Sequence, residues 1–246
     1  MFQFRSKLAA TVALLILFTG CLTIEENYTF KKNGSGTMEY VVDMSEVGEM
    51  MKTLGEMAEA EGSGKPPDDM GTLDMNDELI ALKKIPGIKR VKLDAKKKWV
   101  QRLKFNFKDV TALNAALNIL MSDSSGVPHT FFTWDGSTLV RTNNKHAYEL
   151  GSSMAKAEEA SSEEDGMEGE QTAGDPLAAG EGMDIAFLEA MKYKYSFKFA
   201  EEISNTETAE GITKEAKGAR EVKFDTDWSV ISKDEKALDL KIQLSR

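Results

Sequence analysis

The segment Leu22-Thr23-Ile24-Glu25-Glu26-Asn27-Tyr28-Thr29-Phe30 carries the pattern that decides the fold prediction. Alternate side chains fall on opposite faces of an extended chain, and one of these faces carries Leu22, Ile24, Glu26, Tyr28 and Phe30. The other face is polar throughout, so the pattern is typical of a β-strand with one buried face. Turn-forming residues follow at 32–36, and Met38, Tyr40 and Val42 continue the alternation. We therefore predict a β-hairpin that begins at Leu22.

Similar patterns recur along the rest of the chain. Alternation predicts hairpins over 88–107 and 131–140, and strands over 193–199, 221–230 and 237–244. Helical spacing predicts amphipathic helices over 46–60, capped by Ser45, and after the cap residue Asp109 through Met121. The prediction is an α+β fold, a curved antiparallel sheet of about eight strands with one face covered by the two amphipathic helices. Such a sheet can enclose an apolar cavity.

The residues before Leu22 have the features of a secretory signal. Arg5 and Lys7 precede an apolar run from Leu8 to Phe18, which is much shorter than the ~20 residues of a membrane-spanning helix. The run ends in Leu17-Phe18-Thr19-Gly20-Cys21. This stretch resembles the lipobox of bacterial lipoproteins, which ends in a small residue followed by a lipid-bearing cysteine. The resemblance implies a signal peptide at 1–20 and lipidation at Cys21.

Three strand motifs carry a second resemblance. They are Cys21-Leu22-Thr23-Ile24, Lys104-Phe105-Asn106-Phe107-Lys108-Asp109 and Tyr193-Lys194-Tyr195-Ser196-Phe197-Lys198-Phe199. Together they are similar to the LppM-type domains of exported bacterial lipoproteins. The resemblance implies a lipid-facing α+β domain with a candidate cavity for an amphiphile, and it supplies no catalytic residues.

The segment 149–184 interrupts the folded pattern. It contains eleven acidic residues, one base (Lys156) and no aromatic residue. A segment of this composition buries too little apolar surface to offset the entropy lost on ordering. We therefore predict one α+β domain in two parts, 21–148 and 185–246, separated by an acidic disordered insertion.

Charge and cysteine content exclude some classes of protein. The formal net charge is −10, and removal of residues 1–20 with Arg5 and Lys7 lowers it to −12. An acidic protein is not a general nucleic-acid binder, because phosphate contacts need clustered Lys and Arg, so we expect no nucleic-acid partner. Cys21 is the sole cysteine of the sequence, so a lipid on its sulfur leaves no thiol for a disulfide.

One basic segment stands out within this acidic chain. Residues 83–108 contain eleven Lys and Arg residues and a single acid, Asp94. Anionic lipid headgroups attract such residues. The candidate anionic-lipid contacts are Lys89, Arg90, Lys92, Lys96, Lys97, Lys98, Arg102 and Lys104. Two other interpretations stay open, a solvated sheet face and a surface covered by the acidic segment.

Signals of catalysis are weak. The two histidines, His129 and His146, lack metal-ligand spacing, and no Gly-x-Ser-x-Gly, phosphate loop or dinucleotide motif is present. A pair of catalytic carboxylates can be neither excluded nor located. We therefore predict a non-enzymatic protein with no cofactor, no metal site and no catalytic residue.

The functional hypothesis is a membrane-anchored extracytoplasmic lipoprotein of the bacterial cell envelope. It would be held by lipid on Cys21 and would bind a lipid, another amphiphile or an envelope protein. The alternatives are a purely structural envelope module and a hydrolase of envelope polymers. The lipoprotein resemblance implies the outer membrane if the host has two membranes, because Leu22, and not Asp, follows Cys21.

Overall fold

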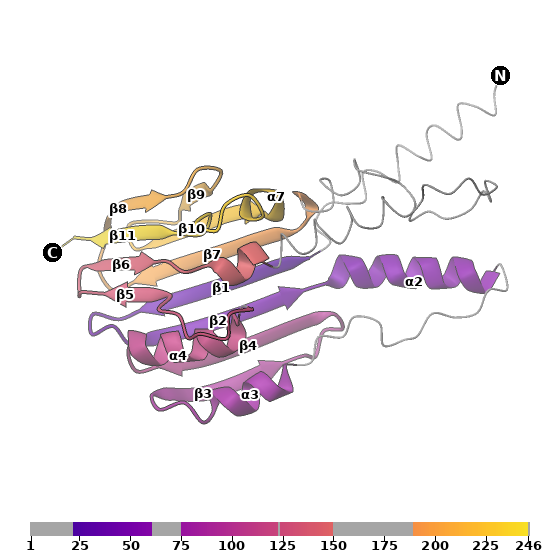
Figure 1. Ribbon diagram of the computed structural model, residues 1–246, viewed down its shortest axis with the longest axis horizontal. Helices are drawn as coiled ribbons and strands as arrows, with labels where there is room; N and C mark the ends of the chain where they lie inside the picture. Colours follow the sequence, from indigo (N-terminus) through magenta and orange to yellow (C-terminus); the bar gives the residue numbers. More distant parts are fainter. Residues whose placement is uncertain (1–21, 61–74, 123, 150–188, 246) are drawn as a thin grey trace, which may run out of the picture.

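The computed structural model describes residues 22–60, 75–122, 124–149 and 189–245. The predicted signal peptide, Cys21 and all but the first residue of the acidic segment lie outside this part of the chain. The described residues form two sheets and several helices (Figure 1), and the predicted α+β class is confirmed. The larger sheet has seven strands, in the order β3 (Ile88–Asp94), β4 (Val100–Phe107), β2 (Gly36–Asp43), β1 (Thr23–Phe30), β7 (Lys192–Phe199), β10 (Glu221–Asp227) and β9 (Thr213–Ala216).

β1 and β7 lie side by side in the middle of this sheet and run parallel, with Thr23 opposite Lys192 and Phe30 opposite Phe199. All other neighbours in the sheet are antiparallel. Hairpins can produce only antiparallel neighbours, whereas β1 and β7 are separated by most of the chain. The sheet is therefore mixed, and its single parallel pair joins the two halves of the sequence.

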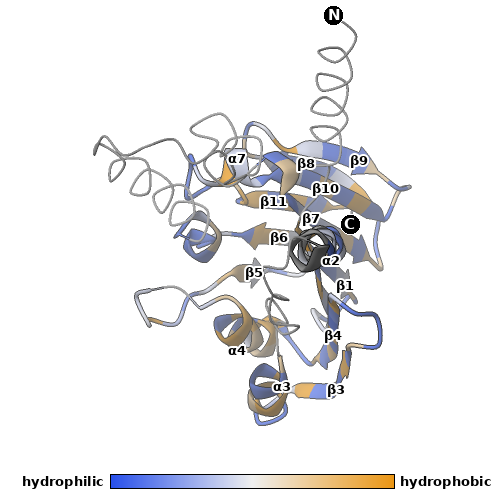
Figure 2. Cartoon of the chain, turned by 90° about the vertical axis from the view of Figure 1, so that its right-hand side faces the viewer, coloured by the Kyte–Doolittle hydropathy of each residue, from blue (hydrophilic) through white to orange (hydrophobic). Residues whose placement is uncertain are grey.

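A second sheet covers part of the inner face of the first. Its strands are antiparallel, in the order β5 (Phe132–Trp134), β6 (Thr138–Arg141), β11 (Leu240–Leu244) and β8 (Ile203–Thr208). Aromatic rings fill the space between the sheets. Tyr28 stacks on Phe197 at 5.1 Å between ring centroids and contacts Phe132 of the small sheet edge-on, also at 5.1 Å. The core is thus a layer of side chains between two sheets. Figure 2 shows the two sheets from one end.

Two helices extend the second layer beyond β5. They are α4 (Val110–Leu120) and α3 (Asn76–Leu82), which contact each other, while α4 also contacts β5, β3 and β4. Asp109 caps α4 as predicted, accepting a hydrogen bond from the Ala112 N–H at 2.8 Å. The buried face of α4 consists of Ala112, Leu113, Ala116 and Leu117.

The helix predicted over 46–60 is present as α2 (Ser45–Ala60), but it extends beyond the end of β2 and does not lie on the sheet face (Figure 1). A single residue, Met44, joins β2 to α2, which leaves no loop for the helix to turn back. Its first turn is closely packed, because a Cβ added to Gly48 would lie 2.3 Å from Trp99 Nε1. The small sheet and α4 take the covering role that the sequence assigned in part to this helix.

The predicted strand over 221–230 ends earlier, at Asp227. The Asp227 carboxylate caps the short helix α7 (Trp228–Ile231), accepting hydrogen bonds from the Ser229 and Val230 N–H groups. Trp228 is buried, as its alternation with Phe224 predicted. None of the described helices is long and apolar enough to cross a membrane.

Candidate functional site

The cations predicted to contact anionic lipid all lie on the β3–β4 hairpin, at one edge of the seven-stranded sheet. All eight of them are exposed. On β4 they alternate with the buried residues Leu103, Phe105 and Phe107, so they project from the polar face. The structure therefore brings the predicted residues together on one element.

The strand register divides these cations between two ends of the sheet. Val100 pairs with Asp43, and Asp43 pairs with Thr23, so the turn before Val100 lies at the end where β1 begins. At the other end, Phe107 pairs with Gly36. We call these the Thr23 end and the Gly36 end. They lie about 23 Å apart along β4 at the usual rise of a strand.

Lys96, Lys97 and Lys98 form the turn at the Thr23 end, which we call the lysine turn. Its backbone is held at several points: Asp94 Oδ1 accepts the Lys96 N–H at 3.1 Å, and the Lys97 carbonyl accepts the Val100 N–H at 3.1 Å. Trp99 adopts a left-handed φ of 69°, and its carbonyl accepts the Met44 N–H at 2.9 Å. The three lysines are thus presented by a fixed turn (Figure 2, the hydrophilic loop between β3 and β4).

Two of these lysines have weak partners at the surface. Lys97 Nζ lies 3.8 Å from Asp43 Oδ2, and Lys98 Nζ lies 5.1 Å from the centroid of the Trp99 ring. Burial by itself would raise the pKa of Asp43, but hydrogen bonds from Ser45 and the charge of Lys97 outweigh it and hold that pKa below its ordinary value. Exposed pairs of this kind contribute little to stability, so the ammonium groups stay available to a partner.

The cations in the middle of the hairpin have an internal partner. Arg102 Nη1 lies 3.2 Å and Lys104 Nζ 4.0 Å from Glu39 Oε1 on β2. Lys92 on β3 is paired with Lys104 on the neighbouring strand β4. Glu39 therefore offsets part of the positive charge at this point of the sheet.

Lys89 and Arg90 lie near the Gly36 end, at an irregularity of β3. The pairing register with β4 shifts between Lys89 and Lys92, and Arg90 has a φ of 55°. β3 is an edge strand, and bulges and cations on such strands prevent pairing with other chains. The Gly36-end cations therefore have a structural explanation that the lysine turn lacks.

A depression of about 490 Å³ lies between α3 and β3, beside the hairpin. It is lined by Asn76, Leu79, Lys83, Val91, Lys92, Leu93, Ala95 and Gln101. Its volume is in the range of ligand pockets, and the buried Gln101 Oε1 has no hydrogen-bond partner. A second depression of about 360 Å³ lies over β1, β7, β10 and β9, lined mostly by polar residues.

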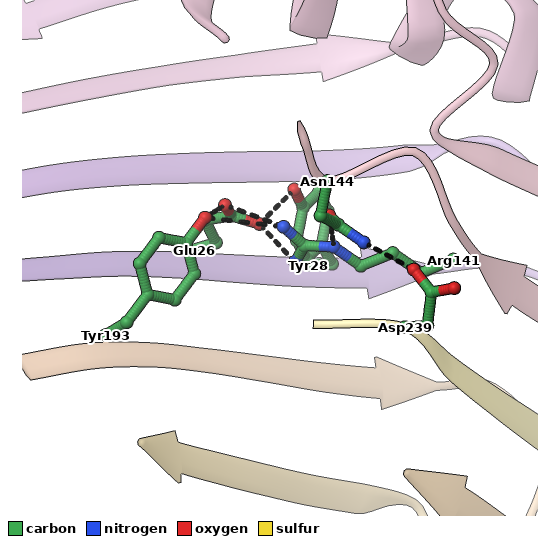
Figure 3. Close-up of polar contacts among 6 residues, drawn as sticks. All are labelled: Glu26, Tyr28, Arg141, Asn144, Tyr193 and Asp239. Carbon is green, nitrogen blue, oxygen red and sulfur yellow. Dashed lines mark hydrogen bonds and ion pairs between the residues drawn. The ribbon is translucent and has the colours of Figure 1, made fainter. Parts of the chain in front are cut away.

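A buried polar cluster connects the two sheets, and sequence reasoning did not identify it as a unit (Figure 3). Arg141, at the end of β6, is 1% exposed, and Glu26, on β1, is 0% exposed. Arg141 Nη1 donates to Glu26 Oε2 at 2.7 Å and Nη2 donates to Glu26 Oε1 at 3.1 Å, a bidentate pair. The Tyr28 hydroxyl donates to Glu26 Oε2 at 2.6 Å, and the Tyr193 hydroxyl donates to Oε1.

The cluster continues from Arg141 toward the surface. Arg141 Nε donates to Asn144 Oδ1 at 2.7 Å, and Asn144 Nδ2 donates to Asp239 Oδ1 at 3.0 Å. Burial opposes the charge of Arg141, but the Glu26 carboxylate together with Tyr193 and Tyr28 outweighs it and keeps the Arg141 pKa well above its ordinary value. Burial also raises the pKa of Asp239, although Asn144 and Arg141 act in the opposite direction. The charged groups are enclosed by Phe132 and Tyr195, whose ring centroids lie 5.7 and 5.3 Å from Arg141 Cζ.

The sequence did contain one sign of this cluster. Glu26 falls on the face of β1 that otherwise carries only apolar and aromatic side chains. A carboxylate in such a position needs a buried partner. The sequence could not identify that partner, because Arg141 lies on a strand of a different sheet.

The two histidines pack against the same ring. His129 and His146 both contact Phe131 edge-on, at 6.0 and 5.7 Å between centroids. Within the described ranges, no group of three or more His, Cys, Asp or Glu side chains is arranged to hold a metal ion. Cys21, the predicted lipidation site, lies outside those ranges.

Comparisons with known proteins give a structural likeness but no family. No protein-family model matches the chain, and no curated protein does so. Among solved structures, the chain is similar to the NMR structure of the folded domain of LppM from Mycobacterium tuberculosis, with a TM-score of 0.42 and 10% sequence identity. The match covers 92% of this chain and 90% of that one. A likeness at this level does not place the chain in a family.

Proposed function

We propose that the protein is a lipid-anchored extracytoplasmic module that works by binding at the surface of a bacterial envelope membrane. The observation that carries this proposal is that a single residue, Leu22, separates Cys21 from the first strand in the sequence. β1 begins at Thr23, and the Leu22 carbonyl already accepts the Lys192 N–H at 2.8 Å. An extended chain spans at most ~3.6 Å per residue, so a lipid on Cys21 would hold the Thr23 end of the sheet within about a nanometre of the headgroups.

Two features of the described residues support binding over catalysis. The Glu26–Arg141 pair is buried, and each of the two charged groups is bonded to the other, so the pair is not accessible to a substrate. The α3–β3 depression, in contrast, opens beside the basic hairpin and combines apolar residues with Lys83 and Lys92. The binding partner that we propose is a lipid, another amphiphile or an envelope protein, and in a host with two membranes we place the protein at the outer one.

The experiment that tests the anchor replaces its thiol. When the full chain is expressed in a bacterium, we expect Cys21→Ser either to leave the membrane fraction almost completely or to accumulate as an uncleaved precursor, because serine cannot accept the thioether-linked lipid. Membrane fractionation and the mass of the N-terminal peptide measure both outcomes. Two or more acyl chains give stable anchoring, so the wild-type protein should resist extraction by salt.

The control variant is Leu22→Ile, which keeps the cysteine and an apolar side chain next to it. It should be processed and retained like the wild type. A cleaved Cys21→Ser protein that stays in the membrane fraction at the wild-type level would refute lipid anchoring through this residue.

A further inference from the structure

The lysine turn and the start of β1 lie at the same end of the same sheet. β4 is separated from β1 by one strand, β2, so Val100 and Thr23 lie about 10 Å apart across the sheet. Three hydrogen bonds fix the turn: Asp94 accepts the Lys96 N–H, the Lys97 carbonyl accepts the Val100 N–H, and the Trp99 carbonyl accepts the Met44 N–H. A partner that reaches the Thr23 end therefore meets three neighbouring ammonium groups in a defined place.

Carboxylates at this end are largely engaged within the fold. Asp43 accepts the Ser45 N–H at 2.9 Å, and Asp94 accepts the Lys96 N–H. Asp227 caps α7 and lies 3.9 Å from Lys192 Nζ. Glu46, in the first turn of α2, is exposed and opposes the lysines. The lysine turn carries three positive charges, and Asp43, which lies 3.8 Å from Lys97 Nζ, offsets only part of them.

We propose that the lysine turn is a contact site for anionic lipid headgroups, and that it tilts the anchored protein toward the edge of the sheet that carries β3 and β4, because α2 extends beyond the Thr23 end and prevents that end from lying flat on the membrane. This inference rests on the proposed anchoring at Cys21. It assigns no lipid contact to Lys89, Arg90 or Lys108, which lie at the Gly36 end of the hairpin.

Distance separates the two sets of cations. Electrostatic interactions between exposed charges decay over ~8 Å at physiological ionic strength. The Gly36 end lies about 23 Å from the Thr23 end along β4, which is more than two such lengths. The net charge of the chain is repelled by the same membrane, so any attraction must come from the cations nearest to it.

The test uses the full-length lipidated protein, reconstituted into a mixture of neutral phosphatidylcholine vesicles and denser vesicles that contain phosphatidylglycerol. Flotation separates the two populations, and the ratio of protein between them is measured. A lysine at an anionic surface contributes a factor of about five. The wild type should therefore prefer the anionic vesicles, and Lys96→Glu/Lys97→Glu/Lys98→Glu should lower that ratio by about tenfold or more.

The matched control is Lys89→Glu/Arg90→Glu/Lys108→Glu, which has the same net charge and also exchanges three exposed cations. It should keep the wild-type ratio. An equal loss in both triple variants, or no loss in either, would overturn the inference while leaving the anchor intact. Protein that floats with neither vesicle would instead contradict the proposed function itself.

A second measurement reads the orientation in the wild-type protein alone. Lysine acetylation followed by mass spectrometry should modify Lys96, Lys97 and Lys98 about fivefold more slowly in anionic than in neutral vesicles. This difference should disappear at 1 M salt, where screening is nearly complete. Lys89 and Lys108 serve as internal references with equal rates in both. Equal rates at the lysine turn would show that it does not touch the membrane.

Discussion

Arg141→Met should lower the free energy of unfolding by about 3–5 kcal/mol, because it removes one partner of a buried ion pair and leaves the other charge uncompensated. Glu26 would lose both bonds of the bidentate pair, at 2.7 and 3.1 Å. Asn144 would lose the donor at 2.7 Å that holds it against Asp239. Urea unfolding followed by circular dichroism measures the change, and the loss should appear as a lower midpoint with a similar slope.

Two further variants separate the pair from the packing around it. The double variant Glu26→Leu/Arg141→Met should be more stable than Arg141→Met, because no buried charge remains, although the hydroxyls of Tyr28 and Tyr193 still lose their acceptor. Arg141→Lys keeps the charge but cannot form the two parallel bonds, so it should fall between the wild type and Arg141→Met. An Arg141→Met protein within about 1 kcal/mol of the wild type would show that the pair is not needed to hold the two sheets together.

The strands were the most predictable part of the fold, because each has a local signal. The segments 22–30 and 193–199 alternate strictly, and both are found as strands with their predicted faces buried. Asp109 capping α4 is equally local, since a side chain bonds to a backbone group three residues away. Patterns of this kind need no knowledge of distant residues.

The pairing of strands is not local, and here the sequence was insufficient. Nothing in β1 or β7 indicates that they are parallel neighbours, or that β5, β6, β8 and β11 form a separate sheet. β8 and β9 were missed as strands, because Ile203–Thr208 is polar apart from its first residue and Thr213–Ala216 is exposed throughout. These short edge strands are determined by their partners more than by their own composition.

The candidate site shows the same division between local and distant information. The cluster of cations in residues 83–108 is visible in the sequence alone, as a run of Lys and Arg with a single acid. Its separation into a lysine turn near Thr23 and a bulged edge near Gly36 depends on the register of β4 with β2 and β1. The strand register therefore shows which cations of the basic segment lie near Thr23, and the sequence alone does not.

Asn114→Ala should cost about 2–4 kcal/mol of stability, because it leaves two buried backbone groups without partners. β5 is an edge strand of the small sheet, so one side of Phe132 has no neighbouring strand. Asn114 on α4 closes that side: its Oδ1 accepts the Phe132 N–H at 2.8 Å, and its Nδ2 donates to the Phe132 carbonyl at 2.9 Å. Phe132 is 1% exposed, so water cannot replace either bond without disturbing the core.

Asn118, one helical turn later, is the matched control for this prediction. It makes the same pair of bonds to His129, with distances of 2.6 and 2.8 Å, but His129 is only partly buried. Water can reach its backbone groups after truncation, so Asn118→Ala should cost about 1 kcal/mol or less. Urea unfolding measures both losses, and hydrogen exchange of the Phe132 amide, which should become faster only in Asn114→Ala, locates the first. Equal costs for the two variants would mean that the burial of Phe132 does not determine the cost of losing these asparagine bonds.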